Sequence, residues 1–170
     1  MNNLSEAKAF APNFELFEMP SLRIIGLEAR WGGELGNTAP ALWDNVLQSS
    51  AGDTLMALPN WKPDCLLGWL GEWDEETDTF VYMACVLCPP DAPVPDGFSH
   101  RDLPAVTVAL GRYGEDAEKT LTRAHALGFE AVPCSWRAEL YFRKEQANPP
   151  KSVKSPGHWL IPVKPMDKSK

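Results

Sequence analysis

One stretch of the chain sets a carboxylate among large aromatic side chains. Residues 136–142 read WRAELYF, and in a strand the side chains of Arg137, Glu139 and Tyr141 project to one face while the apolar ones project to the other. A carboxylate that leaves water is costly unless it is paired, and its pKa tends to rise. A cationic ligand would supply the missing partner, and each aromatic face adds about 0.5–2 kcal/mol through cation–π contact. The other interpretation of the same residues is a solvated Glu139 paired with Arg137 or Arg143, and the segment alone leaves both open.

Size and charge narrow the classes of function that could use this carboxylate. The chain has 170 residues, 44% of them hydrophobic, with seven tryptophans and a formal net charge of −7. This is enough for one domain, or for two small halves that share a core. No run of lysine or arginine forms a basic stripe, so we expect no nucleic-acid partner. No apolar run has the length of a membrane span and the start of the chain lacks a signal pattern, which predicts a cytoplasmic protein with no membrane partner.

Metal and cofactor chemistry find little support in the sequence. Cys85 and Cys88 form a C-x-x-C pair, but the pair falls inside an apolar run that is typical of a strand, and no second ligand pair follows it. We therefore expect buried thiols, with no metal and no cofactor. His158 has no metal-binding partner near it in the sequence, and neither a G-x-S-x-G elbow nor a glycine-rich phosphate loop is present.

The elements that would position Glu139 are indicated by periodicity and by breakers. The sequence predicts strands at 14–19, 22–31, 65–73, 80–88, 105–110, 136–142 and 158–163, and helices at 41–48 and 116–127. Thr38 is the expected N-cap of the first helix. Residues 49–63 are expected to form a loop, in which residues 54–58 could hold a short turn. Residues 89–95 are expected to form a proline-rich linker, and residues 98–102 an approach to the next strand. Pro162 favours an edge position or a bulge for the last strand.

The predicted elements repeat. Each half follows the order strand, helix, strand, strand, over residues 14–88 and 104–163. Pro20 precedes a strand that ends in Arg30-Trp31-Gly32, and Pro104 precedes a strand that ends in Arg112-Tyr113-Gly114. A duplicated unit of this kind is expected to pair its halves about a pseudo-twofold axis, where a ligand cleft is common. The strand at 65–73 is then the counterpart of the strand that carries Glu139.

The second half resembles a known family. Pro104-Ala105 before a strand that ends in Arg112-Tyr113-Gly114, then a helix, then Glu139-Leu140-Tyr141 and a closing Ile161-Pro162-Val163 are similar to the GyrI-like small-molecule-binding domain. That domain is also the effector-binding half of some AraC-type and MerR-type multidrug regulators. The resemblance covers residues 14–165. Two features depart from the regulators: the segment before residue 14 has no room for a helix-turn-helix, and tryptophans stand where tyrosine is more usual.

The resemblance implies a fold class and a site. We expect an α+β fold of duplicated βαββ modules with pseudo-twofold symmetry, antiparallel sheets and helices packed on one side. Residues 14–165 would form the single domain, after a flexible N-terminus at 1–13 and before a tail at 166–170. Glu139 would be the central glutamate of an aromatic-lined pocket. The other candidate ligand-binding residues are Trp31, Trp69, Tyr113, Tyr141 and Trp159.

Three functions remain compatible with these residues. The first is stand-alone binding of hydrophobic, cationic small molecules. The second is hydrolysis of strained electrophilic compounds with Glu139 as the catalytic acid and base, because a glutamate of raised pKa can activate water or protonate a leaving atom. The third is a protein partner of the gyrase type, for which the acidic turn at 74–78 is the candidate surface; an acidic turn that is simply solvated is the alternative. The sequence does not distinguish binding from catalysis, since both need one carboxyl group in an aromatic-lined pocket from which water is excluded.

Overall fold

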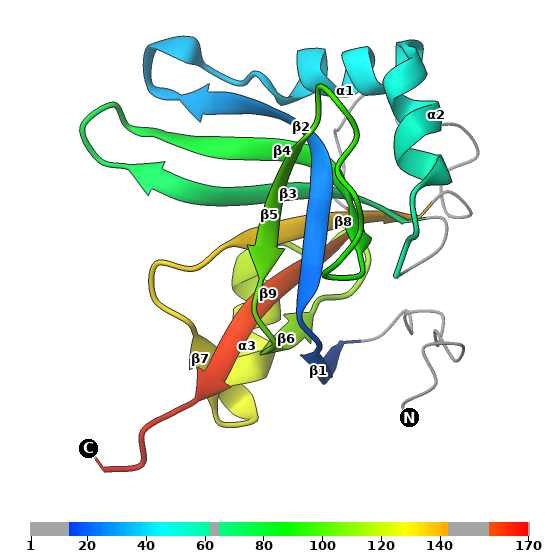
Figure 1. Cartoon of the computed structure of the whole chain (residues 1–170). Helices are drawn as coiled ribbons and strands as arrows, with labels where there is room; N and C mark the ends of the chain where they lie inside the picture. Colours follow the sequence, from blue (N-terminus) through cyan, green and yellow to red (C-terminus); the bar gives the residue numbers. More distant parts are fainter. Residues whose placement is uncertain (1–13, 62–64, 143–156, 170) are drawn as a thin grey trace.

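The computed structural model describes residues 14–61, 65–142 and 157–169, and these form a curled, largely antiparallel sheet with helices on one side (Figure 1). The predicted α+β class is confirmed. The strands are β1 (Glu15–Met19), β2 (Leu22–Gly32), β3 (Cys65–Asp74), β4 (Thr79–Cys88), β5 (Ser99–Leu103), β6 (Val106–Leu110), β7 (Phe129–Ala131), β8 (Arg137–Phe142) and β9 (His158–Pro165). The helices are α1 (Ala39–Gln48), α2 (Ser50–Ala57) and α3 (Ala117–Ala126), with a short 3-10 turn at Gly33–Leu35.

The strand order displays the duplicated plan. It runs β1-β6-β9-β8-β3-β4-β2-β5, with β7 attached to β9. The second half contributes β6, β9 and β8, and the first half contributes β2, β4 and β3 in the mirrored order, so the antiparallel pair β3–β8 is the seam between the halves. The flanking strands are exchanged: β1 pairs with β6 of the second half, and β5 pairs with β2 of the first half. Each half therefore completes the edge of the other.

One face of the sheet closes on itself to make a core. Side chains from strands at both ends of the order, such as Met19 of β1 and Leu103 of β5, join Leu67, Met83 and Leu140 from its centre in one buried cluster. Strands so far apart in the order can share a cluster only if the sheet curls. Ala138 and Leu140 are fully buried in this cluster, which confirms the predicted core face of the strand that carries Glu139.

The helices cover the opposite face. Helices α1 and α2 lie over β2 and β4, and α3 lies over β6 and β9 (Figure 1). Trp43, Val46 and Leu55 anchor α1 and α2 to the first half, whereas Ala124 anchors α3 to the second. Because the helices sit over the outer strands of each half, the seam β3–β8 lies between the two helical layers.

Several local predictions were wrong for identifiable reasons. Residues 50–57 form helix α2 instead of a loop, because the Ser49 hydroxyl accepts a hydrogen bond from the Ala51 amide at 3.1 Å and Leu55 is fully buried against the sheet. The short strands β5 and β7 were not predicted. Both are polar or short segments whose strand geometry comes from pairing with β2 and β9.

Pro162 lies in an inner strand, contrary to the edge position that the sequence favours. Strand β9 pairs with β6 on one side, where Pro162 faces Val108, and with β8 on the other. The pairing with β8 ends at Leu160, and the Pro162 carbonyl accepts a hydrogen bond from the Val132 amide on that same side. The proline nitrogen, which carries no hydrogen, therefore faces the side of β9 on which the pairing with β8 has already ended. The proline costs no hydrogen bond between β9 and β8.

The helix caps differ between the halves. Asp116 caps α3, since its side chain accepts a hydrogen bond from the Lys119 amide at 2.8 Å. Thr38 occupies the N-cap position of α1, but its hydroxyl donates to the Arg30 carbonyl at 2.7 Å and the Asn37 side chain accepts from Ala39 instead. Thr38 thus ties the helix start to the end of β2.

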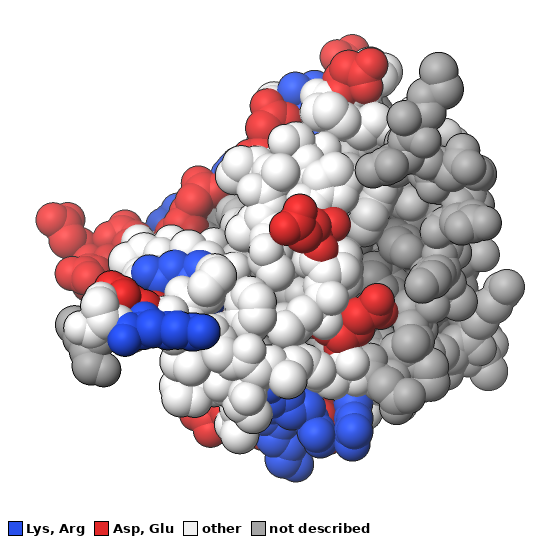
Figure 2. Space-filling model, turned by 90° about the horizontal axis from the view of Figure 1, so that it is seen from below, with Lys and Arg blue, Asp and Glu red and all other residues white. Residues whose placement is uncertain are grey.

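Three of the four cysteines lie in the buried parts of β3 and β4. Cys65, Cys85 and Cys88 are buried, Cys134 is exposed, and burial raises the pKa of the Cys85 thiol. None of the helices in the described part of the chain is long and apolar enough to cross a membrane. On the described part of the face shown in Figure 2, lysines and arginines lie in small separate groups among acidic and uncharged residues.

Candidate ligand site

Glu139 lies in a row of residues that crosses the centre of the sheet. Ala84 of β4 pairs with Gly68 of β3, Gly68 pairs with Glu139 of β8, and Glu139 pairs with Trp159 of β9. Residues paired in this way project to the same face, which is the face that carries the helices. The carboxylate therefore stands on the seam of the two halves, between α1 and α3. Only 9% of its surface is exposed, which excludes the solvated interpretation.

Two tyrosine hydroxyls hold the carboxylate. Tyr141 donates to Glu139 Oε2 at 2.6 Å, and Tyr82 donates to the same oxygen at 3.3 Å. The Tyr82 hydroxyl in turn accepts a hydrogen bond from Trp43 Nε1 at 2.9 Å. This chain of bonds joins β8, β4 and helix α1 at one acid. Among the described residues, no donor reaches the second oxygen, Oε1.

Burial dominates the protonation of this cluster. Desolvation raises the pKa of Glu139, and the hydrogen bonds from Tyr141 and Tyr82 partly oppose that rise because they stabilise the carboxylate. The same burial, together with the nearby negative charge of Glu139, raises the pKa values of Tyr82 and Tyr141, so both phenols keep their protons. The arrangement is an acid held by two neutral donors.

No cation pairs with Glu139 within the described residues. Arg137, the closest basic residue along the strand, is exposed, and Arg143 lies outside the described residues. A carboxylate that is nearly buried and lacks a charged partner is costly, and such groups concentrate at functional sites. The described residues also hold no cluster of three or more metal-binding side chains.

Gly68 makes room for this cluster. A Cβ atom at position 68 would collide with the Tyr82 hydroxyl and lie 2.8 Å from Tyr82 Cζ and 3.1 Å from Glu139 Oε2. The absence of a side chain on the seam strand β3 is what allows the Tyr82 ring to reach across to the carboxylate.

Aromatic rings surround the hydrogen-bonded cluster on the helix side. Trp43 packs edge-on against Tyr141, with ring centroids 5.6 Å apart, and Trp31 packs edge-on against Tyr82 at 5.4 Å. Trp31 also lies 5.1 Å from Phe80, which is two residues before Tyr82 on the same face of β4.

The structure brings some of the sequence-predicted site residues together. Tyr141 touches Glu139, Trp159 pairs with it across β8 and β9, and Trp31 reaches it through Tyr82. Trp69 instead belongs to the core on the opposite face of the sheet, since it follows Gly68 directly in the strand. Tyr113 lies half-exposed beyond β6, edge-on to His158 at 5.8 Å, and has no contact with Glu139.

Sequence reasoning missed three members of the cluster. Tyr82 lies in an apolar strand in which nothing sets it apart from core residues, and Trp43 was correctly assigned to the core of α1 but not to the acid's hydrogen-bond chain. Gly68 has no side chain that could mark it as a site residue. Its place in the strand at 65–73, the predicted counterpart of the strand that carries Glu139, was the one feature of the sequence that pointed to it.

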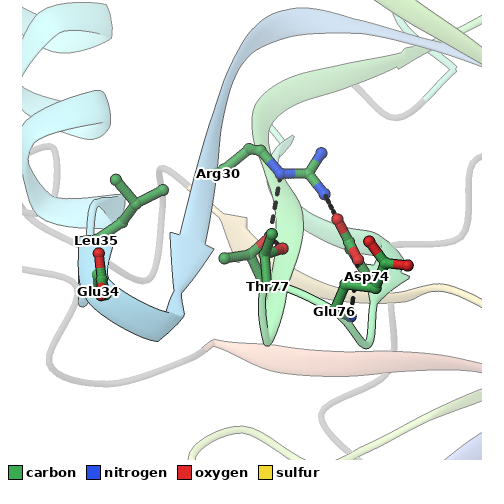
Figure 3. Close-up of a pocket in the computed structure, with 7 residues that line it drawn as sticks. Arg30, Glu34, Leu35, Asp74, Glu76 and Thr77 are labelled. Carbon is green, nitrogen blue, oxygen red and sulfur yellow. Dashed lines mark hydrogen bonds and ion pairs between the residues drawn. The ribbon is translucent and has the colours of Figure 1, made fainter.

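Two cavities lie near the ends of the first-half strands. The smaller, of about 470 Å³, lies between the end of β2 and the β3–β4 turn. Figure 3 shows Arg30 extending from β2 toward Asp74, with which it pairs at 3.8 Å, while Arg30 Nε donates to Thr79 at 3.1 Å. The Arg30 guanidinium thus neutralises part of the negative charge of the acidic turn at 74–78. The larger cavity, of about 710 Å³, adjoins Leu70 and Arg137 on the face that carries Glu139.

Comparison with known proteins identifies the fold. The sequence matches no family model, and a search of curated proteins gives no significant match. The structure is similar to that of SAV2435 bound to tetraphenylphosphonium, with a TM-score of 0.61 and 14% identity over 89% of this chain and 94% of the other. A Staphylococcus aureus MU50 protein described as a transcription regulation protein gives 0.59 and 14% over 89% and 98%. The C-terminal domain of EcmrR gives 0.52 and 11% over 91% and 98%. At these identities the likeness concerns the fold alone, and that shared fold fits the expected resemblance to a GyrI-like effector-binding domain.

Proposed function

We propose that the chain binds hydrophobic, cationic small molecules at Glu139. The observation that carries this proposal is the nearly buried carboxylate, which accepts two tyrosine hydrogen bonds on one oxygen and has no cationic partner among the described residues. A lipophilic cation would supply the missing charge without the desolvation cost of a strongly hydrated ammonium. Trp159 and Trp31, which are both partly exposed, offer the aromatic surfaces for its apolar groups.

One of the comparison structures supports this ligand class. SAV2435, which shares the fold, was solved with the lipophilic cation tetraphenylphosphonium. EcmrR contributes a C-terminal domain of the same fold. We infer that the present chain binds lipophilic cations as well, and that it does so at the seam of its two halves.

The direct test is a titration with tetraphenylphosphonium followed by tryptophan fluorescence or calorimetry. We expect Glu139→Gln to weaken binding by about ten- to hundredfold, because a charge-assisted contact contributes about 1.5–3 kcal/mol. Glu118→Gln is the matched control: it removes the same charge from an exposed site on α3, so non-specific attraction changes equally. Equal affinities in the wild type and Glu139→Gln would refute the proposal.

Hydrolysis of strained electrophilic compounds is the second candidate, favoured by the raised pKa of Glu139 and by the Tyr141 hydroxyl at 2.6 Å. A protonated carboxyl at this position can deliver a proton to a leaving atom, and its conjugate base can activate water. Product formation that depends on Glu139 across a panel of such compounds supports this activity. Binding without turnover in the same panel leaves the receptor function.

A further inference from the structure

The larger cavity is shaped by an irregularity in β3. Gly71 pairs with Val81 and Asp74 pairs with Thr79, so two residues of β3, Glu72 and Trp73, stand opposite the single residue Phe80 of β4. Glu72 adopts a φ of 56°, which lies in the left-handed region. Bulges of this kind bend a strand and re-aim its side chains, and they are frequent beside binding sites.

The bulge lays Trp73 over Phe80. Their rings are stacked, with centroids 5.8 Å apart and planes 16° from parallel. Trp73 is nevertheless 58% exposed, and both rings line the cavity. An indole supported on one face and open on the other is a platform for a further flat ring.

The platform is continuous with the surroundings of Glu139. Phe80 contacts Trp31, Trp31 contacts Tyr82, and Tyr82 donates to Glu139. Along the strands the cavity begins two residues from the acid, because Arg137 precedes Glu139 and Leu70 follows Gly68 on the same face. From Ala84, which pairs with Gly68, to Phe80, which lies opposite Trp73, β4 advances four residues, a span of about 13 Å at about 3.3 Å per residue.

Most of the charged side chains around the cavity lie beside a charge of opposite sign, and together they leave a net charge of about −1. Glu72 is held by Arg101, which also pairs with Glu28 at 3.0 Å. The remaining charged side chains at the cavity are Glu75 and Arg137, which have opposite signs. The cavity therefore lacks a buried, unpaired carboxylate such as Glu139, and what it offers a ligand is the stacked surface of Trp73, which suits a flat aromatic group.

We propose that this cavity binds the flat, uncharged aromatic end of an elongated ligand whose cationic end lies at Glu139. The proposal rests on the proposed function and specifies its ligand class: two-part molecules long enough to reach from the seam to Trp73. A volume of about 710 Å³ accommodates a drug-sized group. Compact cations use the Glu139 end alone.

The test compares two lipophilic cations that differ only at the far end: decyltriphenylphosphonium, and the same compound with an anthracenyl group at the end of the decyl chain. We expect the anthracenyl compound to bind the wild-type protein about three- to tenfold more tightly, as stacking on Trp73 adds to the contact at Glu139. In Trp73→Ala the two compounds should bind equally, with the affinity of the decyl compound unchanged. Trp73→Phe should restore part of the difference.

The controls separate this inference from the proposed function. Leu127→Ala removes a comparably exposed apolar side chain, 61% exposed at the end of α3, and should keep the difference. Glu139→Gln should weaken both compounds alike. If both bind the wild type equally, or if the anthracenyl advantage survives in Trp73→Ala, the platform is refuted while the receptor function stands. If neither compound binds, the receptor function fails and this inference fails with it.

Discussion

The sharpest test of the site's geometry is the addition of one methyl group at Gly68. An alanine side chain there would overlap the Tyr82 hydroxyl and press on Glu139 Oε2 at 3.1 Å. Tyr82 has no room to yield, since it is fully buried and bonded to Trp43. Overpacking costs about 1–3 kcal/mol, and an overlap this close with a buried ring belongs to the upper part of that range, about 2–3 kcal/mol. Replacing a strand glycine by alanine returns about 0.5–1 kcal/mol. We expect Gly68→Ala to lower the free energy of unfolding by about 1–2 kcal/mol.

The measurement is urea unfolding at neutral pH, accompanied by thermal melting. A loss of about 1–2 kcal/mol corresponds to a fall in Tm of about 2–8 °C for a domain of this size. The double variant Gly68→Ala with Tyr82→Phe supplies the decisive comparison, because removal of the hydroxyl relieves the closest overlap. The double variant should be more stable than the sum of the two single effects predicts, by about 1 kcal/mol.

Two results would refute this reasoning. Unchanged stability of Gly68→Ala would mean that the Tyr82 ring does not occupy the space above position 68. Strict additivity in the double variant would mean that the cost of the methyl group arises elsewhere, and the hydrogen-bond chain from Trp43 to Glu139 would then need another arrangement.

The remaining predictions concern protonation and capping. The folded-state pKa of Glu139 lies above its ordinary value of 4.5. The contribution of Glu139 to stability is therefore fully present below pH 4.5 and is lost as the pH rises through the folded-state pKa. Glu139→Gln should remove this loss in unfolding curves taken from pH 4 to 8. Tyr141→Phe should raise the pKa of Glu139 further, as seen in an NMR titration of its carboxyl carbon, because it removes a donor that stabilises the charged form. Affinity for tetraphenylphosphonium should fall as pH drops through that pKa, and a pH-independent affinity would contradict a role for the ionised acid. Asp116→Ala should cost about 1 kcal/mol of stability, whereas Thr38→Ala should cost less because Thr38 does not cap its helix.

Residues with strong local signals were predictable from the sequence. Asp116 at the start of α3, the alternation of β8 and the repeat of breakers before β2 and β6 are local or periodic, so they survive without knowledge of the partner strands. The duplicated plan followed from them, whereas the central position of Glu139 was implied by the resemblance to the GyrI-like domain. Helix α2 and strand β5 were missed because their geometry depends on distant partners: Leu55 on the sheet beneath it, and residues 99–103 on β2.

The site was predicted less completely than the fold, for a related reason. Glu139 and Tyr141 lie two residues apart in one strand, so their side chains project to the same face and their contact could be predicted. Tyr82 reaches the same acid from β4 across the intervening strand β3, where Gly68 has no side chain to block it. Trp69 was expected in the site because it is a large aromatic on the right strand, yet the register that pairs Gly68 with Glu139 sends the Trp69 side chain to the other face. A one-residue difference in register, which no single-strand pattern reveals, decides which of these residues can meet a ligand.

The seam also explains why the duplicated fold carries a single central acid. Gly68 and Glu139 face each other directly across β3 and β8, where side chains of paired residues lie about 4.5–5.5 Å apart. A second carboxylate in place of Gly68 would put two desolvated charges at that separation, and the repulsion would drive one of them to bind a proton. It would also fill the space that the Tyr82 hydroxyl needs. One half must therefore supply the acid and the other half must supply the room for it, so the two halves can match in backbone but not in side chains at their common axis.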